Sequence, residues 1–538
     1  MTSVPRARER LERGLRSLVA HDVITVLLFA LGALMIAFIS RLAFLSQDAN
    51  WDLLNYHAYN PASILDGTWF HDLHPAGQPS FITPYQDLVT YPVISILPAP
   101  IATALIAAVQ LSICIPVGLI LQTVVPDLTK RRAIAIGLIG ISGAMFLTEL
   151  GATMGDVPPA IPIAWGLWLL LSEMTGEHRH PRLRMLLAGI LVGSSVALKL
   201  TMAYVAPGIL VVVAALAVAG KWRSALIFSV TAPIAAIVLY APWGLVLQAN
   251  FGSPLFPFYN TIFNAPRYPS EDISDGRFLV TGLVDLIKLP LHLAKGIAST
   301  AEMPFADVRW LLAFVAAAAG VGVAALRGVV FRRWNGWRDQ LPRLALLGFW
   351  IPSFFVWGHS FGIQRYAMIL EVLALPVMAV GLVLALPRLP RPISLLALLV
   401  VAAILARTTT IVDFGRRPMT WAPLFPTETI EPLARYDAVV TGGAPLAFLG
   451  AVTRDAPGAS NQIWAGNPFN TADQAVFLER LHGKKVGVVF YADQRDAGVG
   501  AAGFLGMKLT DDCASFTNPL SSQYIGSTLE VCTAVPEP

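Results

Sequence analysis

Long apolar segments constrain this 538-residue chain more than any other feature of its sequence. Many of them run for about 20 residues, the length that an α-helix needs to cross the hydrocarbon core of a bilayer. Only 13% of the residues are charged, whereas about 25% are charged in a typical soluble domain. The sequence therefore excludes a soluble enzyme and predicts an all-α polytopic membrane protein.

Eleven membrane helices are predicted from these segments. They lie near residues 23–44, 98–122, 133–150, 158–174, 185–200, 203–219, 225–247, 309–326, 344–359, 365–386 and 393–409. Segments rich in Lys and Arg stay on the cytoplasmic side of a membrane, so the basic residues 1–22 are expected to form a cytoplasmic N-terminus. An odd number of helices in the membrane domain, residues 23–410, then places residues 411–538 outside. The expected location is the bacterial inner membrane.

The net charge of +4 has no bearing on nucleic acid. Basic residues gather in the loops that this topology makes cytoplasmic, for example at 130–132 and 179–184, as membrane topology alone demands. No nucleic-acid partner is therefore expected. Three arginines are exceptions to this charge rule, because they lie at or after the end of the last helix on the predicted outer side: Arg407, Arg416 and Arg417.

Within the C-terminal residues 411–538, the composition changes to mixed polar from Pro426 onward. Strand-like runs at 437–441 and 486–491 and a helical pattern at 472–481 predict a small α/β extracytoplasmic domain. Cys513 and Cys532 lie in this region and could pair only in an oxidising compartment such as the periplasm. Two unpaired thiols are the alternative.

The first external loop, residues 46–91, contains five aspartates and no lysine or arginine. Topology biases basic residues away from the outer face but does not select for acids. Asp52 opens the stretch 53–66, where apolar residues recur at helical spacing and predict an interfacial helix. Asp52 is either a cap of this helix or a general base, because the helix dipole favours an ionised carboxylate at that end.

Three histidines of the same loop are candidate metal ligands: His57, His71 and His74. Their spacing fits no established metal site, and surface histidines are the alternative reading. We therefore assign no metal site and expect no cofactor, although a divalent metal is compatible with the sequence.

The second external loop, residues 248–305, is rich in aromatic residues and prolines around 251–259. Aromatic side chains of this kind commonly anchor a loop at the membrane surface, and they can also stack on sugar rings. The following segment, 278–297, is too polar to span the bilayer and predicts a second interfacial helix.

Further charges occur where predicted helices meet the outer face. Asp156 precedes Pro158–Pro159 in a short external turn and is either a cap or a functional acid. Lys199 interrupts an apolar stretch, and an ionisable group at the centre of a membrane helix costs roughly 2.5–3.5 kcal/mol by insertion scales, which marks a candidate site. Arg365 begins the tenth helix and offers a guanidinium fork that matches phosphate oxygens, while Glu371 could pair with either cation.

These residues together resemble the GT-C superfamily of integral-membrane glycosyltransferases, in the manner of bacterial mannosyltransferases and aminoarabinose transferases. The resemblance covers most of the membrane part. It rests on Asp52 with Tyr56, on 153–159 (TMGDVPP), on 197–201 (ALKLT) and on 364–366 (QRY). A GT-C fold implies external loops and, in many members, a C-terminal soluble domain.

The resemblance also implies a reaction and its residues. A sugar would pass from a polyprenyl-phosphate donor to an envelope glycan, lipid or protein acceptor on the outer face, with inversion. Asp52 matches the family base, and Asp48 or Asp156 would supply a second carboxylate, because Leu53 stands where many members have a glutamate. Lys199 and Arg365 would bind the donor phosphate. The substrate contacts expected are Tyr56, His57 and Tyr366.

Two other functions fit part of the sequence. A transporter or lipid flippase would also use many helices and an intramembrane lysine, but internal repeats are typical of that class and none is evident. A non-catalytic assembly subunit is the third possibility, in which replacement of Asp52 would not affect the glycan.

Overall fold

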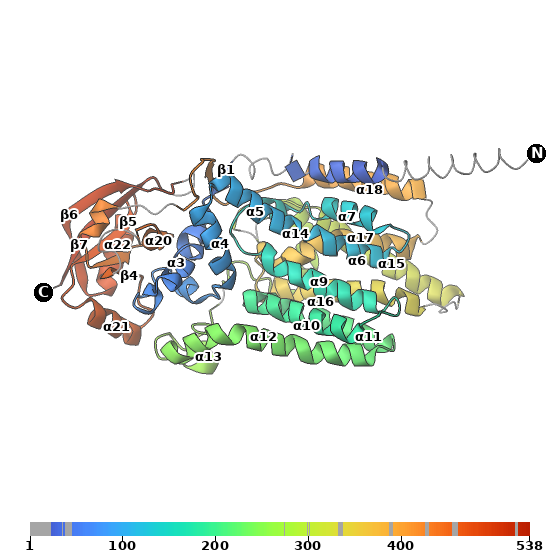
Figure 1. Ribbon diagram of the computed structural model, residues 1–538, viewed down its shortest axis with the longest axis horizontal. Coiled ribbons are helices and arrows are strands. Elements are labelled where there is room, and N and C mark those ends of the chain that lie inside the picture. The colour runs from blue at the N-terminus through green and yellow to red at the C-terminus, as the bar shows by residue number, and fades with distance from the viewer. Residues whose placement is uncertain are drawn as a thin grey trace, which may run out of the picture.

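The computed structural model describes residues 23–34, 36–37, 46–273, 275–297, 300, 302–331, 337–386, 391–425, 430–453, 461–521 and 526–537. Figure 1 shows an elongated molecule in which long helices fill one part and a mixed α/β region lies at the other end. Short helices of the first external loop lie between these two parts.

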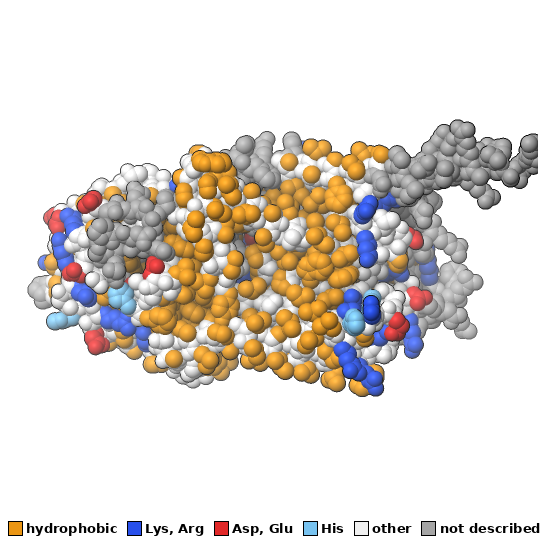
Figure 2. Space-filling view, viewed as in Figure 1, with side chains coloured by type: hydrophobic (Ala, Val, Ile, Leu, Met, Phe, Trp, Pro, Cys, Tyr) orange, Lys and Arg blue, Asp and Glu red, His pale blue; other side chains and the backbone are white. Residues whose placement is uncertain are grey.

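Seven of the described helices are long and apolar enough to cross a membrane. They are Ala99–Val124, Pro181–Leu198, Leu200–Val218, Trp222–Phe251, Arg309–Arg327, Arg338–Ser360 and Gln364–Ala385. Figure 2 shows apolar side chains in a broad band over these helices, with charged side chains gathered at the two ends of the molecule. The chain is thus a multi-pass membrane protein, and the count of eleven spans stays a prediction.

Burial separates central from peripheral helices. Helix α17 (Met368–Ala385) belongs to the most buried of the seven spans, Gln364–Ala385, with 83% of its apolar window buried, and apart from Glu371 it is apolar on all sides as a central helix must be. Helix α12 (Trp222–Phe251) has only 22% enclosed and lies at the edge. Helix α15 (Arg309–Phe331) packs on α17 with its backbone close by, since a Cβ added to Gly381 would lie 2.1 Å from the Ala316 carbonyl oxygen.

Several of the seven spans consist of two consecutive helical elements, and shorter helices lie between the spans. Besides α12, α15 and α17, the helices of this part are α5 (Ala99–Leu111), α6 (Cys114–Val124), α7 (Lys130–Gly140), α8 (Ala144–Glu149), α9 (Val157–Glu173), α10 (Pro181–Leu198), η4 (Leu200–Val205), α11 (Ala206–Val218), η5 (Trp337–Gln340), α16 (Leu341–Ser360), η6 (Gln364–Ala367) and α18 (Arg391–Thr408). The N-terminal residues 1–22 lie outside the described residues.

The predicted helix 133–150 is two helices, because charged side chains satisfy the backbone at the break between α7 and α8. Arg309 donates to the carbonyl oxygens of Gly140 (2.8 Å) and Ser142 at the end of α7. The carboxylate of Asp307 accepts from Ala144 N–H (2.9 Å) at the start of α8. Buried backbone groups at helix ends need such partners in an apolar environment.

Glu371 belongs to the same break. It accepts from the N–H groups of Met145 (3.4 Å) and Phe146 (3.0 Å), and Gly143 leaves room for it, since a Cβ there would meet its carboxylate. The expected pairing of Glu371 with Arg365 or Lys199 is therefore wrong.

The first external loop is helical where expected. It contains β1 (Ser46–Asp48), the π-helical turn η1 (Leu53–His57), α3 (Tyr59–Leu65), η2 (Thr68–Phe70), η3 (Gln78–Phe81) and α4 (Tyr85–Ile96). The second external loop contains α13 (Asn260–Phe263) and α14 (Leu283–Lys295), the latter within the predicted segment 278–297.

Strand β2 (Arg416–Pro418) pairs antiparallel with β1, so the start of the C-terminal region lies against the first external loop. Arg416 donates to the carbonyl oxygens of Thr148 (3.0 Å) and Leu150 (2.9 Å). Arg417 donates to the Pro519 carbonyl (2.8 Å). These specific contacts explain why two arginines follow the last predicted helix against the charge rule.

The expected small α/β region is present at the C-terminus. Its five-stranded sheet has the order β4-β3-β5-β7-β6. The strands are β3 (Ala438–Thr441), β4 (Ile463–Ala465), β5 (Val486–Tyr491), β6 (Met507–Thr517) and β7 (Thr528–Pro536), with helices α19 (Glu431–Ala434), α20 (Phe448–Thr453), α21 (Thr471–Leu481) and α22 (Arg495–Phe504). Strand β3 is parallel to β4 and β5, whereas β7 is antiparallel to β5 and β6.

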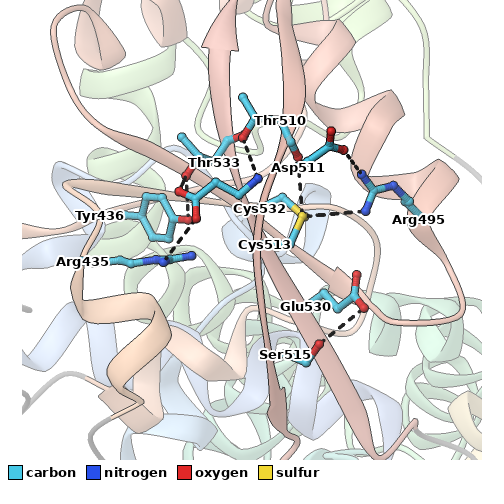
Figure 3. Close-up of a disulfide and its surroundings, with 11 residues drawn as sticks. Arg435, Tyr436, Arg495, Thr510, Asp511, Cys513, Ser515, Glu530, Cys532 and Thr533 are labelled. Atoms are coloured by element: carbon cyan, nitrogen blue, oxygen red, sulfur yellow. Dashed lines mark hydrogen bonds and ion pairs between the residues drawn. A yellow bond between two sulfur atoms is a disulfide. The ribbon is translucent and has the colours of Figure 1, made fainter.

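A disulfide joins Cys513 to Cys532 across the paired strands β6 and β7 (Figure 3). The guanidinium of Arg495 lies beside both sulfur atoms. Cys114 is free and partly buried in α6.

Candidate functional site

Four charged side chains from distant parts of the sequence meet in one cluster, which we call the charge cluster: Asp52, Asp156, Lys199 and Arg365. Each stands next to a helix end, so their carboxylates, ammonium and guanidinium converge where helices begin or stop. Asp52 precedes η1 and Asp156 precedes α9, while Lys199 follows α10 and Arg365 lies in η6 before α17.

Arg365 is the centre of the charge cluster. Its Nη1 lies 2.8 Å from Asp52 Oδ2 and 3.2 Å from Asp156 Oδ2. Lys199 Nζ donates to the other oxygen of Asp156. The Nε of Arg365 donates to Glu302 (3.1 Å), a residue of the second external loop that the sequence did not predict. The side chains of Asp156 and Arg365 are 0% and 8% exposed, so these ion pairs are largely shielded from water.

Neither carboxylate is a helix cap. Asp52 and Asp156 occupy the N-cap positions of η1 and α9, but neither side chain accepts a hydrogen bond from its helix. Asn50 takes that role for η1, because its Oδ1 accepts from Leu53 N–H (2.8 Å). The cap interpretation of both acids is therefore wrong, and both carboxylates are left to face the two cations.

Asp48 is engaged outside the charge cluster, and its expected role as a catalytic carboxylate stays a prediction. Its oxygens accept from the N–H and hydroxyl of Thr153 (2.7 Å each) and from Asn50. It fastens the turn that carries Asp156 to the start of the first external loop. Asp156 is thus the second carboxylate of the charge cluster.

The π-helical turn brings further side chains to Asp52. Ala58 N–H bonds to Leu53 C=O (3.1 Å), the i to i+5 pattern of a π turn, and such turns often mark functional sites. Tyr56 is buried in this turn. Burial raises the pKa of the Tyr56 hydroxyl well above its ordinary value, and Asp52 raises it further. The Tyr56 hydroxyl therefore stays neutral beside Asp52.

Tyr366 completes the cationic side of the charge cluster. Its ring lies 4.5 Å from Lys199 Nζ and 5.1 Å from the Arg365 guanidinium carbon. Cations are stabilised over an aromatic face, so Tyr366 holds both side chains in place.

His57 pairs with Asp87 of α4, with 2.8 Å between Nδ1 and Oδ1. Both side chains are buried. Asp87 belongs to the acidic loop but was not predicted as a site residue, since only the tertiary fold brings α4 to η1.

Among the residues that the structure describes, no group of three or more His, Cys, Asp or Glu side chains is arranged to hold a metal ion. His57, His71 and His74 each contact an aspartate instead, namely Asp87, Asp72 and Asp473.

The chain matches no protein-family profile and no curated protein. It is similar to the crystal structure of ArnT from Cupriavidus metallidurans bound to undecaprenyl phosphate, with 17% identity and a TM-score of 0.44 over 70% of this chain and 63% of that one. The chain thus covers just under two thirds of that ArnT structure. It is also similar to the apo oligosaccharyltransferase of Archaeoglobus fulgidus, with 14% identity and a TM-score of 0.47 over 88% of this chain and 71% of that one.

Proposed function

We propose that this chain is an inverting GT-C-type membrane glycosyltransferase. It moves a sugar from a polyprenyl-phosphate donor to an envelope glycan, lipid or protein acceptor on the outer face of the bacterial inner membrane. The observation that carries the proposal is the charge cluster, in which a buried carboxylate of the first external loop lies against a guanidinium and an ammonium.

Asp52 is the base of this reaction. Its carboxylate makes no bond to its own helix and faces the cluster, so it is free to take the proton of an acceptor hydroxyl. A positioned general base contributes about 10²–10⁴-fold to a rate. Asp156 holds Lys199 and Arg365 in the orientation that the reaction requires.

Lys199 and Arg365 bind the donor phosphate. A guanidinium fork and an ammonium stabilise phosphate oxygens as negative charge develops on the leaving group. Their partners in the structure are carboxylates, which occupy these cations much as phosphate oxygens would. Tyr56, His57 and Tyr366 line the same region and contact the substrates.

The outward orientation follows from charge. The charge cluster includes the first external loop, whose helices α3 and α4 lie between the membrane helices and the C-terminal sheet (Figure 1). Lys and Arg side chains lie at both ends of the apolar band (Figure 2), and the basic loops at 130–132 and 179–184 are those that topology assigns to the cytoplasm. The N-terminus is then cytoplasmic and the α/β region extracytoplasmic.

The test is sugar transfer in proteoliposomes that hold purified wild type or Asp52→Asn, supplied with a panel of polyprenyl-phosphate sugars and envelope acceptors. We expect Asp52→Asn to transfer about 10²–10⁴-fold more slowly with an unchanged melting temperature. Asp275→Asn, which alters a partly exposed loop acid paired with Arg277, is the matched control and should retain activity. Movement of lipid or solute by the wild type without a new glycosidic bond would replace the proposal with a transporter.

A further inference from the structure

The proposed transfer does not yet say which group donates a proton to the departing phosphate. The acceptor oxygen forms a bond to the anomeric carbon and loses its proton to Asp52, while the bond from that carbon to the phosphate oxygen breaks and its electron pair stays on the phosphate. The second pKa of a phosphate monoester is about 6, so the departing group carries a second negative charge at neutral pH unless it gains a proton. Lys199 and Arg365 are already paired with carboxylates.

His57 has the geometry of a proton donor at this place. Its Nδ1 is fixed by Asp87 at 2.8 Å, and both side chains are at most 6% exposed. Its Nε2 is buried and has no hydrogen-bond partner among the described residues. A buried ring nitrogen without a partner is uncommon in a folded protein, and it is available to a substrate.

The ring of His57 lies beside the turn that carries Asp156. A Cβ added to Gly155 would lie 3.4 Å from His57 Cε1, the ring carbon next to Nε2, and 2.5 Å from the amide nitrogen of Gln86. Gly155, with φ of +79°, therefore leaves the space in which this edge of the ring sits. Nε2 belongs to the same edge, beside the residue that precedes Asp156, and the ring lies within the electrostatic reach of Asp52 and Lys199.

The charges around His57 favour its protonated form. Burial lowers its pKa, but Asp87 from α4 and Asp52 from the start of η1 raise it, while Lys199 from the end of α10 lowers it slightly. The net effect is a pKa raised above the ordinary value of 6.5. When protonated, the imidazolium has Asp87 as its counter-ion and keeps the N–H at Nε2 free to donate.

We propose that His57 is the general acid of the proposed glycosyl transfer, and that Nε2–H gives its proton to the phosphate oxygen as the bond to the sugar breaks. Asp87 is a positioning residue that holds the ring and balances its charge. The products are the glycoside and a singly protonated lipid phosphate. Exchange with water then restores the Asp52 carboxylate and the His57 imidazolium. This inference rests on the proposed function and adds a second proton-transferring group to it.

The test is the pH dependence of initial transfer rates with the prenyl-phosphate sugar that is most active in the proteoliposome panel. We expect the wild-type rate to fall as pH rises through the pKa of His57. His57→Gln should be about 10²-fold slower and should lack that fall. Asp87→Asn should move the fall to lower pH, because the largest influence that raises the pKa is gone. His71→Gln, at a partly exposed histidine of the same loop, should keep the wild-type profile.

A high-pH fall that persists in His57→Gln would overturn the acid role while leaving the transferase proposal intact. If His57→Gln does not fold, Asp87→Asn decides alone, and an unshifted fall overturns the proposal. If the wild type transfers no sugar, the proposed function fails. The role of His57 can then still be tested by measuring the binding of farnesyl phosphate with ³¹P NMR. We expect that binding to weaken above the His57 pKa in wild type only, and an identical pH dependence in His57→Gln would overturn the inference.

Discussion

At the scale of single residues, side-chain type and sidedness predicted most of the charge cluster. Asp52, Asp156, Lys199 and Arg365 were all expected at the outer ends of helices, and the structure brings them together. Their partners could not be predicted in the same way. Glu302 and Asp87 contact the site through the folding of loops, and no spacing in the sequence links either residue to it.

Loss of the central cation should destabilise the protein. Arg365→Gln leaves Asp52 without its ion pair and Asp156 with Lys199 alone. Removal of one partner of a buried ion pair costs about 3–5 kcal/mol, and we expect a loss of this size in denaturant unfolding in detergent. Adding Asp52→Asn to Arg365→Gln should recover part of it.

The control for that experiment is Arg277→Gln, which breaks an ion pair at a side chain that is 75% exposed. Exposed pairs contribute little to stability, so this variant should unfold like the wild type. An Arg365→Gln variant as stable as Arg277→Gln would contradict the central role of Arg365.

At the scale of elements, apolar periodicity located the helices but not their interruptions. The break between α7 and α8 depends on Asp307, Arg309 and Glu371, which lie far along the chain from it. The π turn at η1 likewise depends on Asn50 as its cap. Hydrophobic patterns record which face is buried, whereas such breaks depend on polar partners that only the fold supplies.

Close packing of α15 on α17 gives a test at this scale. Gly381→Ala would place a Cβ 2.1 Å from the Ala316 carbonyl oxygen, and overpacking of this kind typically costs about 1–3 kcal/mol. Gly322→Ala is the matched control in α15, because nothing lies within 4 Å of its added Cβ. We expect a lower melting temperature for Gly381→Ala only, while Gly322→Ala should match or exceed the wild type, since alanine favours a helix. Equal losses in both variants would exclude the packing explanation.

At the scale of the whole molecule, the two external loops and the C-terminal region meet at Asp473 of α21. His74 of the first loop contacts its carboxylate at 2.8 Å and Arg267 of the second loop at 2.7 Å. The small α/β region was predictable from composition. Its attachment through His74 was not, because that histidine suggested only a metal ligand or a surface residue.

Acid should loosen this attachment. Burial raises the pKa of Asp473, but the hydrogen bond with His74 and the charge of Arg267 lower it by more than burial raises it. The net pKa of Asp473 therefore lies below its ordinary value. A carboxyl with a depressed pKa contributes stability above the unfolded pKa of about 3.9, and that stability is lost as pH falls through the folded value. The protection factors for amide hydrogen exchange across residues 471–481, which correct for the intrinsic pH dependence of exchange, should therefore fall in acid.

Asp473→Asn should exchange faster at neutral pH and respond less to acid, because the ionised partner is gone. The exposed residue Asp493 provides the control, and Asp493→Asn should behave like the wild type. An unaltered acid response in Asp473→Asn would contradict the assignment of this carboxylate.

The pairing of β1 with β2 sets an order of assembly during synthesis. The segment that leads into Asp52 is translated before nearly all of the membrane helices, yet its strand partner at Arg416–Pro418 emerges after them. Arg416 also holds the carbonyls that precede the Asp156 turn. The site therefore gains its last supporting contacts only when the ribosome has passed this point, so an unfinished chain already inserted in the bilayer lacks a completed site.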